Sequence, residues 1–485
     1  MDDLNTILEQ ERVNLSYFER LSHSHDITPV PDRIAANYNN IPSAVVKPTT
    51  IEEVQELVKF AERKKTCLIP KGRGTSYLWG SVPVVGGIVV DMVEMNDIYD
   101  FHKEDEWIEA GAGATWEKLE GYLETQGYTL RVYPTSMPAA TLGGWISSAG
   151  TGLGAGGYGI GSLMYGPIGE NLAGLEVVNG KGEILNLHAK KDVADFVGTD
   201  GITGFITKAR LKVRKKAQFS EKILVNITSN EKLQKLVELL GSMNTPYFAQ
   251  FEDDGIIKCK LSIGLHSAPC EKGFLLMSVF EGDREKVVGE TARFLKDTKK
   301  LGGRIFSKPE AEVEWGERCY PMRVKRSGPT VVAGEFTINS SRLNAALQNI
   351  YGEMPEGAKN GVHGVVVKSP FVVILPQLFS DERGGFGFLA SLSYSKRFND
   401  IGIRHGGKPY GVGHLNAFNS KQVHGLSGFK SLKLLKAKHD PQNVINPGKG
   451  IEHRTRFGFS VPPFLFSLSM FSLGLFRNSG VKMWN

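Results

Sequence analysis

Residues 71–80, KGRGTSYLWG, lie between two apolar stretches, CLIP (67–70) and GGIVVDM (86–92), that are typical of β-strands. Glycines and small hydroxyl side chains in such a loop allow backbone amides to approach a phosphate closely. The loop matches neither the GxGxxG pattern that opens a Rossmann helix nor the Walker pattern. It therefore predicts a phosphate-bearing ligand that is held in another way.

Three further glycine-rich segments come after this loop. They are VYPTSMPAATLGGWISSAGTGLGAGGYGIG (132–161), YGPIGENLAGLEVVNGKGEIL (165–185) and GTDGITGFITKARLKVR (198–214). In the second of these, NGKG predicts a turn between two strands. Glycine at this density indicates backbone that runs close to a flat, extended ligand. We expect a pyrophosphate at 71–80 and a planar body at 132–161. Neither segment is predicted to open a helix in the manner of GxGxxG, which disfavours a Rossmann site.

The pattern of apolar residues changes along the chain. Residues 42–65 predict a strand and then an amphipathic helix, with Thr50 and Glu53 at capping-box spacing. Residues 107–128 again predict a strand and then a helix, which starts near Thr115. This alternation of strands and helices predicts an α/β domain in this part of the chain. From about 216, strand–helix units such as 222–243 predict an α+β domain with helices on one side of an antiparallel sheet. A last helix should stop at Asp440-Pro441.

The composition is that of a globular protein, with 41% hydrophobic and 23% charged residues. Its 58 Lys+Arg and 52 Asp+Glu leave a net charge of +6 without a concentrated basic face, which argues against nucleic-acid binding. The cysteines lack CxxC spacing, which argues against a metal or iron–sulfur cage and fits a reducing compartment. The acidic N-terminus is not a secretory signal, and no stretch is long enough for a spanning helix. These features favour a cytoplasmic location, with a peripheral membrane position left open.

These motifs together resemble the flavoproteins of the vanillyl-alcohol oxidase/p-cresol methylhydroxylase superfamily. The nearest branch is that of the FAD-linked 2-hydroxy-acid dehydrogenases, of glycolate-oxidase large-subunit and D-lactate-dehydrogenase type. The matching motifs, in family order, are PSAVVKPTTIEEV, IPKGRGTS, IEAGAGATWEKL, TLGGWISSAGTG, LEVVNGKGEI, GTDGITGFITKARLKV and DPQNVINPGK. The resemblance implies an α+β fold: an FAD-binding domain of two subdomains, and an inserted α+β cap domain over the isoalloxazine.

The domain boundaries rest on this resemblance and on the changes in pattern. We expect a helical N-terminal segment at 1–41, the FAD-binding domain at 42–216 and the substrate or cap domain at 217–430. The chain then returns to the FAD domain at 431–456 and ends in an apolar tail at 457–485.

The resemblance also assigns residues to FAD by position. It implies that backbone amides of 71–76 wrap the pyrophosphate and that 134–150 line the flavin and its chain. It implies that Ile206 meets the adenine or ribose through its backbone, and that Asn446 approaches the flavin. The complete set is Lys71, Gly72, Arg73, Gly74, Thr75, Ser76, Pro134, Thr135, Ser136, Gly143, Gly144, Ser147, Ser148, Gly150, Ile206 and Asn446.

Two departures from the family pattern bear on cofactors. Many relatives attach FAD covalently through a histidine in the first loop, but this chain has no histidine between 26 and 101, which predicts non-covalent FAD. Relatives that oxidise 2-hydroxy acids often bind a divalent metal through a GEHG segment and a second His-rich segment. Here Val412 stands near the place of the glutamate, and no spaced second histidine comes after His363. We therefore predict no metal.

The catalytic candidates lie in the second half of the chain. His414 and His405 occur in RHGGKPYGVGHLNAF (404–418), and a neutral imidazole can accept the substrate hydroxyl proton as hydride leaves for flavin N5. Either can instead be a loop histidine bonded to backbone. One of Arg323, Lys325 and Arg326 can pair with a substrate carboxylate, as arginine does bidentately. On an extended strand Arg323 would share a face with Lys325, and Arg326 would point away. A solvated strand face is the alternative.

Three functions stay open at this point. The leading one is an FAD-dependent dehydrogenase that oxidises a C–OH substrate, a small 2-hydroxy acid such as lactate or glycolate, and passes electrons to a protein, quinone or other acceptor. The second is an FAD oxidase of sugars, lactones or alcohols that uses oxygen. The third is a flavin electron-transfer subunit that serves an iron–sulfur or membrane partner.

The tail at 457–485 contains an apolar run, VPPFLFSLSMFSLGLF (461–476). Arg454, Arg456 and Arg477 bracket this run. It is too short to span a bilayer comfortably. It can lie in a membrane interface, dock on a partner, or fold back on the chain's own core. We favour the last by a small margin.

Overall fold

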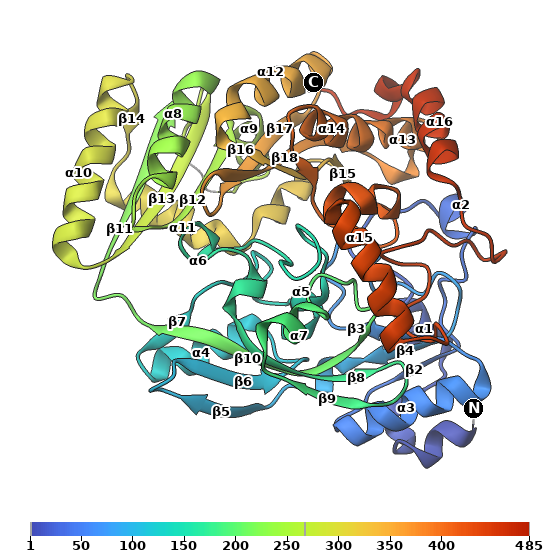
Figure 1. The fold of residues 1–485 in the computed structure, drawn as a ribbon. Helices are drawn as coiled ribbons and strands as arrows, with labels where there is room; N and C mark the ends of the chain where they lie inside the picture. Colours follow the sequence, from blue (N-terminus) through green and yellow to red (C-terminus); the bar gives the residue numbers. More distant parts are fainter. Residues whose placement is uncertain (1, 266–267, 485) are drawn as a thin grey trace. The chain divides into compact units, whose positions relative to one another are not determined.

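The computed structural model describes residues 2–265 and 268–484, which fold into two compact units (Figure 1). Unit 1 comprises the chain up to Tyr158, Pro167–Lys215 and Gly411–Pro463. Unit 2 comprises Gly159–Gly166, Lys216–Tyr410 and the chain from Phe464.

The chain re-enters unit 1 at Gly411 rather than at 431. The reason is local, because the amide of Gly411 donates to the carbonyl of Gly150 (2.6 Å) and that of His414 donates to the carbonyl of Leu78 (2.8 Å). The N-terminal segment also belongs to unit 1, where Leu4 and Leu8 are buried.

The first sheet of unit 1 is built around the predicted strand–helix pattern. Its strands, in spatial order, are β1 (Val13–Asn14), β2 (Ala44–Val46), β4 (Ile88–Asp91) and β3 (Leu68–Lys71). Strands β2, β4 and β3 run parallel. Helix α3 (Ile51–Lys64) begins with the capping box of Thr50 and Glu53, which confirms that prediction, and buries Leu57 and Val58 in the core. Strand β3 ends where the 71–80 loop begins.

The second sheet of unit 1 is antiparallel. Its strands, in spatial order, are β5 (Ile98–His102), β6 (Trp107–Gly111), β10 (Gly204–Lys215), β8 (Leu172–Asn179) and β9 (Ile184–Leu187), with β7 (Tyr128–Leu130) beside β10. The NGKG turn joins β8 to β9 as predicted. Helix α4 (Trp116–Thr125) is capped by Thr115, and helix α15 (Ser420–His439) ends before Asp440, also as predicted.

Unit 2 contains one extended antiparallel sheet. Its strands, in spatial order, are β14 (Arg304–Ile305), β11 (Phe219–Ile227), β13 (Phe274–Gly282), β12 (Pro246–Asp253), β17 (Asn360–Val366), β18 (Phe371–Ser380), β16 (Phe336–Asn339) and β19 (Lys408–Pro409), with β15 (Thr330–Ala333) beside β18.

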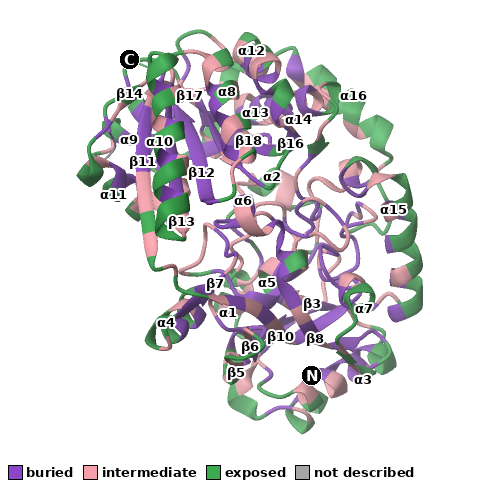
Figure 2. Cartoon of the chain, turned by 60° about the vertical axis from the view of Figure 1, so that its left-hand side comes forward, coloured by how far each residue is buried: buried purple, intermediate pink, exposed green. Residues whose placement is uncertain are grey.

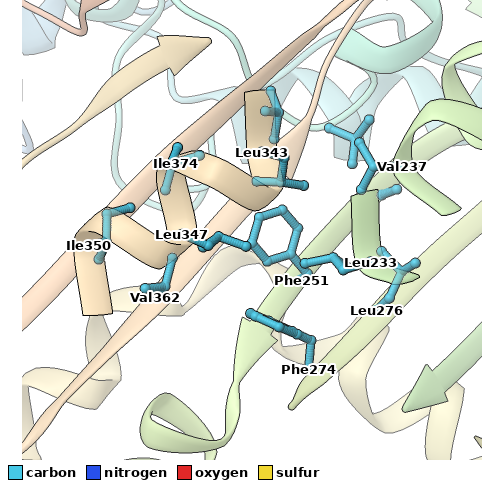
Figure 3. Close-up of a cluster of buried hydrophobic side chains, with 14 of the residues drawn as sticks. Leu233, Val237, Phe251, Phe274, Leu276, Leu343, Leu347, Ile350, Val362 and Ile374 are labelled. Atoms are coloured by element: carbon cyan, nitrogen blue, oxygen red, sulfur yellow. The ribbon is translucent and has the colours of Figure 1, made fainter. Parts of the chain in front are cut away.

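One face of this sheet packs against helices α8 (Asn230–Gly241), α10 (Arg284–Lys300) and α12 (Leu343–Glu353). Figure 3 shows Phe251 of β12 between side chains of α8 and α12. This apolar core confirms the predicted α+β unit, but the expectation of helices on one side only is wrong, because α9 (Asp254–Ser262) and α11 (Lys308–Gly316) pack on the other face of the sheet. Alternate residues of the strands point the other way, and several of them are polar.

The C-terminal tail divides into an exposed helix and a docked end. Helix α16 (Pro463–Gly474) is drawn mostly in the colour of exposed residues in Figure 2. Beyond it, η10 (Arg477–Gly480) packs against α13 (Phe386–Ser391), and Val481 bridges to Ser380 in unit 2. Within 461–476 the expected self-docking therefore holds only at Gly474 and Phe476, and the docked residues after 476 lie outside that run. In the described part of the chain, no helix combines the length and apolar character needed to cross a membrane.

Candidate cofactor and active site

The 71–80 loop presents unbonded backbone amides. Among the residues that the structure describes, the amides of Gly74, Thr75 and Ser76 donate no hydrogen bond. Gly74 has φ of +64°, a conformation that L side chains rarely adopt. At Gly72 an added Cβ would lie 2.1 Å from Thr141 Oγ1. The loop thus needs glycine for its shape and leaves three donors for an anion, which is the arrangement that a pyrophosphate requires.

The side chain of Lys71 ends beside Gly74, where an added Cβ would lie 3.6 Å from its Nζ. Its Nζ donates to the carbonyls of His23 (3.2 Å) and His25 (2.7 Å), and burial lowers the pKa of Lys71 to about 8. Nearby, the Asp26 carboxylate accepts from the amide of Trp79 (2.8 Å). The N-terminal segment is therefore tied to both ends of the loop. The predicted role of 71–76 through backbone amides stays a prediction, and the Lys71 side chain has a structural role.

The second glycine-rich segment forms a short helix, α5 (Leu142–Ser147). This helix is not opened in the manner of GxGxxG, because its two glycines, 143 and 144, lie inside the turn, which the buried Leu142 and Ile146 fix. The Ser147 hydroxyl donates to the carbonyl of Gly143 (2.7 Å), and the Ser148 hydroxyl donates to that of Gly144. These serines are only half-buried, so they border an accessible region of unit 1.

The flanks of α5 are folded tightly on themselves. Pro134 begins a turn in which its carbonyl accepts from the amide of Met137 (3.0 Å). At Gly150, with φ of +50°, an added Cβ would lie 2.3 Å from the carbonyl oxygen of Gly156. Glycine is required at this position by close approach of the backbone. Contacts of Thr135, Ser136 and their neighbours with FAD stay predictions.

Asn446 and Asp200 bring four loops of unit 1 together. The Asn446 Nδ2 donates to the carbonyls of Gly80 (2.9 Å) and Asp200 (2.8 Å). The Asp200 carboxylate accepts from the amides of Gly413 (3.0 Å) and Ala149 (3.3 Å). The 71–80, 132–161, 198–214 and 411–414 segments, which are distant in the sequence, therefore meet at these two side chains.

This meeting point is strongly desolvated. Burial raises the pKa of Asp200 to about 6 and lowers the pKa of Lys449 to about 7, although each side chain favours the charge of the other. The Lys449 Nζ donates to the carbonyl of Val82 (2.6 Å). The Oδ1 of Asn446 is buried and has no partner in the described part of the chain, so it remains available to a ligand. Sequence reasoning missed Asp200 and Lys449, although both stand in quoted motifs, GTDG and NPGKG.

Ile206 lies near the start of β10. It pairs with Val177 of β8, and the register shifts between Ile206 and Lys208. The side chain is buried. A bulge of this kind re-aims the backbone next to it, and the contact of Ile206 with the adenine or ribose stays a prediction.

His414 is buried in an aromatic stack. It is fully shielded from solvent, its ring lies 4.1 Å from that of His453, and Tyr38 meets it edge-on. The carbonyl of Gly448 lies 2.8 Å from His414 Nδ1 and can only accept, so Nδ1 carries the proton and Nε2 is a bare acceptor. Burial lowers the pKa of His414 well below its usual value. The ring is neutral as expected, but its enclosure favours a positioning role, and its role as base stays a prediction.

His405 and Arg323 lie in unit 2. His405 caps α14 (Ser393–Arg404), and its Nε2 lies 3.0 Å from Asn349 Oδ1, which favours a structural role. Arg323 is on η6 (Pro321–Ser327), so the extended strand expected there is wrong. It pairs with Glu317 (3.0 Å) and lies over the ring of Tyr320. The segment after α11 (Lys308–Gly316) is therefore helical, and Arg323 is already neutralised by Glu317.

A buried charged cluster occupies the polar face of the unit 2 sheet. The Lys260 Nζ of α9 (Asp254–Ser262) lies 2.5 Å from Glu252 and 3.8 Å from Glu314 of α11 (Lys308–Gly316). His363 Nδ1 lies 3.5 Å from Glu252. Burial alone would raise the pKa of Glu252, but Lys260 and His363 lower it to about 2. An ammonium group thus compensates these carboxylates. Within the described residues, no group of three or more His, Cys, Asp or Glu side chains could hold a metal ion.

Glu335 is a second acid–base group of unit 2 that sequence reasoning missed. It lies between β15 and β16, where its amide donates to Asn399 Oδ1 (3.0 Å) and its carbonyl accepts from the amide of Tyr410 (2.8 Å). Its half-buried carboxyl forms no hydrogen bond within the described chain, and desolvation raises its pKa to about 8. A carboxyl group tuned in this way can exchange a proton near neutral pH.

Comparison with known proteins identifies the cofactor domain. Residues 42–188 match the family of FAD binding domains. The chain is similar to the glycolate oxidase subunit GlcD of Bacillus subtilis, with 24% identity and coverage of 89% of this chain and 92% of that protein. It is also similar to the mitochondrial D-lactate dehydrogenase (cytochrome) of Arabidopsis thaliana, with 29% identity and coverage of 93% and 79%. The solved structure of p-cresol methylhydroxylase with substrate bound matches with a TM-score of 0.75 at 17% identity, over 93% of this chain and 96% of that one.

The chain is therefore a flavoprotein with an FAD binding domain, in a fold of the p-cresol methylhydroxylase type. This result confirms the resemblance stated from the motifs, the α+β fold class and FAD as the cofactor. The residues of unit 1 fit such a group, since the free amides of 74–76 suit its pyrophosphate and the unpartnered Oδ1 of Asn446 suits a polar group of the ligand.

Proposed function

We propose that this protein is an FAD-dependent dehydrogenase that oxidises the C–OH group of a small 2-hydroxy acid such as lactate or glycolate. The observation that carries the proposal is the free-amide loop at 74–76, placed within a domain that matches the FAD binding family. Similarity over most of the chain to proteins named glycolate oxidase subunit and D-lactate dehydrogenase supports the substrate class.

In this proposal FAD is held by the loops of unit 1 without a covalent bond. The amides of residues 74–76 hold the pyrophosphate, and α5 with its flanking serines borders the flavin. The first loop offers Thr75 and Ser76 but no histidine, which supports a dissociable cofactor. When bound, FAD supplies a hydride acceptor at flavin N5.

The chain itself must accept the hydroxyl proton. We propose two candidates, His414 in unit 1 and Glu335 in unit 2. His414 is supported by its neutral ring and bare Nε2. Glu335 is supported by its unpaired carboxyl and raised pKa, so that its base form increases as the pH rises through about 8. If the rate of flavin reduction rises through this pH range in the wild type and not in Glu335→Gln, Glu335 is the group that accepts the proton.

Anaerobic reduction of the bound flavin by a panel of hydroxy acids tests the proposed function. We expect bleaching by one 2-hydroxy acid and slow reoxidation in air, with fast reoxidation by an added quinone or protein acceptor. Rapid reoxidation in air would instead indicate an oxidase of sugars, lactones or alcohols. Absence of bleaching by any acid or alcohol, with FAD fully loaded, would refute the dehydrogenase and favour an electron-transfer subunit.

A further inference from the structure

Helix α16 carries an apolar stripe that the described residues of unit 2 leave exposed. Phe464, Leu468, Phe471 and Leu475 are 69%, 59%, 69% and 70% exposed. Their spacing of four, three and four residues places them along one face of the helix and its end. Large apolar side chains that are contiguous on a surface usually mark an interaction site. We call these four residues the α16 stripe.

The C-terminal end of the helix is held on unit 2 by Gly474 and the residues after it. Gly474 is buried beside Ser393, and the ring of Phe476 packs edge-on against Phe386. Beyond it, the Tyr394 hydroxyl donates to Asn478 Oδ1 (2.5 Å). These contacts fix the end of the helix on the unit 2 surface, while the α16 stripe stays bare. The α16 stripe therefore belongs to a helix whose C-terminal end is packed on unit 2.

The chain around the stripe is basic and contains no acid. Residues 453–485 include no Asp or Glu, and residues 457–476 carry no charge at all. The flanking cations are Arg454, Arg456, Arg477 and Lys482. Arg454 pairs with Glu452 (3.0 Å) and Lys482 with Asp381 (3.6 Å). Arg456 is exposed and forms no ion pair within the described part of the chain.

A second exposed aromatic pair precedes the helix in the chain. Phe457 and Phe459 are 63% and 58% exposed, and their rings stack 6.1 Å apart at the turn before Pro463. An uncharged aromatic segment with cations at both ends complements an anionic lipid surface, in which apolar side chains enter the interface and cations meet the headgroups.

We propose that the α16 stripe and its basic flanks dock this protein on an anionic lipid membrane. Twelve helical residues extend about 18 Å, short of the roughly 30 Å hydrocarbon core, so the helix lies in the interface and does not span it. A stable protein partner would need about 800 Å² of complementary surface on each side. A row of four side chains with no charge pattern of its own offers little such complementarity, whereas a lipid interface requires none. The proposal does not depend on the substrate.

Co-sedimentation with lipid vesicles tests the proposal on the full, FAD-loaded chain. We expect binding to phosphatidylcholine vesicles that contain phosphatidylglycerol, weaker binding without it, and release by salt. The triple variant Phe464→Ser, Leu468→Ser, Phe471→Ser should bind at least about tenfold more weakly, because each change removes apolar contact. Phe18→Ser, at a position 82% exposed in unit 1, is the matched control and should bind like the wild type.

Two further measurements complete the test. Phe471→Trp keeps the stripe apolar, and brominated lipid should quench its added fluorescence. Three outcomes would overturn the proposal. They are equal vesicle binding by the wild type and the triple variant, no binding by either, and no quenching of the new tryptophan. A wild-type dimer that the triple variant loses, without vesicle binding, would also overturn it and make a second copy of the chain the occupant.

Discussion

Lys260→Met would leave two buried carboxylates without their compensating ammonium. Lys260 and Glu252 are 6% and 5% exposed, and Glu314 is 3% exposed. The pKa of Glu252 lies near 4.5 in the unfolded chain and near 2 in the folded one. Since one pH unit corresponds to about 1.4 kcal/mol, this difference corresponds to about 3 kcal/mol, part of which comes from His363. Removal of one partner of a buried ion pair costs about 3–5 kcal/mol. We expect Lys260→Met to lower the stability of unit 2 by about 3 kcal/mol at neutral pH.

The pH dependence has a definite sign. The pKa of Glu252 is lower in the folded state, so its contribution to stability is present above about 4.5 and is lost as the pH falls towards 2. The wild type and Lys260→Met should therefore converge in stability below pH 4.5. The double variant Glu252→Gln, Lys260→Met should be more stable at neutral pH than Lys260→Met alone, because Glu252→Gln removes the uncompensated charge.

Hydrogen exchange of peptides from β12 and β17, with denaturant unfolding, would measure the stability of unit 2 directly. Lys258→Met provides the control on the same helix, because Lys258 is 56% exposed and its ion pair with Asp254 should contribute less than about 1 kcal/mol. Equal loss of protection in Lys260→Met and Lys258→Met would refute the reasoning.

Three other predictions concern the flavin. Acid precipitation should release FAD into the supernatant, and a yellow pellet would show a covalent bond. Gly74→Val should abolish FAD retention, because a side chain at φ of +64° strains the loop and blocks its amides, whereas Gly127→Val, with φ of +75° and open space around it, should keep FAD. His414→Ala should slow flavin reduction by substrate by about 10² to 10⁴ with unchanged flavin content if His414 is the base, while His405→Ala should react at the wild-type rate. If His414→Ala instead reduces its flavin at the wild-type rate but has lowered thermal stability, His414 has only a positioning role.

Local signals in the sequence determined the elements and the cofactor. The capping box at Thr50, the cap at Thr115 and the turn at 179–182 depend on residues within a few positions of one another, so they can be predicted without the fold. Glycine density can also be interpreted without the fold, because a backbone that must approach a ligand closely needs glycine in any surroundings. These signals sufficed for the predicted elements and for a phosphate-bearing ligand with a planar body, whereas FAD and the α+β fold class were implied by the resemblance of the ordered motifs to a known family.

Only the tertiary structure decided what individual charged and polar side chains do, because their roles depend on burial and on partners distant in sequence. Lys71 stands in the phosphate loop, but its ammonium binds carbonyls at 23 and 25. His414 occurs in a glycine-rich loop, yet residues of two other segments, Tyr38 and His453, enclose its ring. Asp200 and Asn446 join four distant loops, and Lys260 meets Glu252 across a strand–helix pair. Desolvation shifts the pKa of such groups only once the chain has packed around them, and no periodicity in the sequence records it.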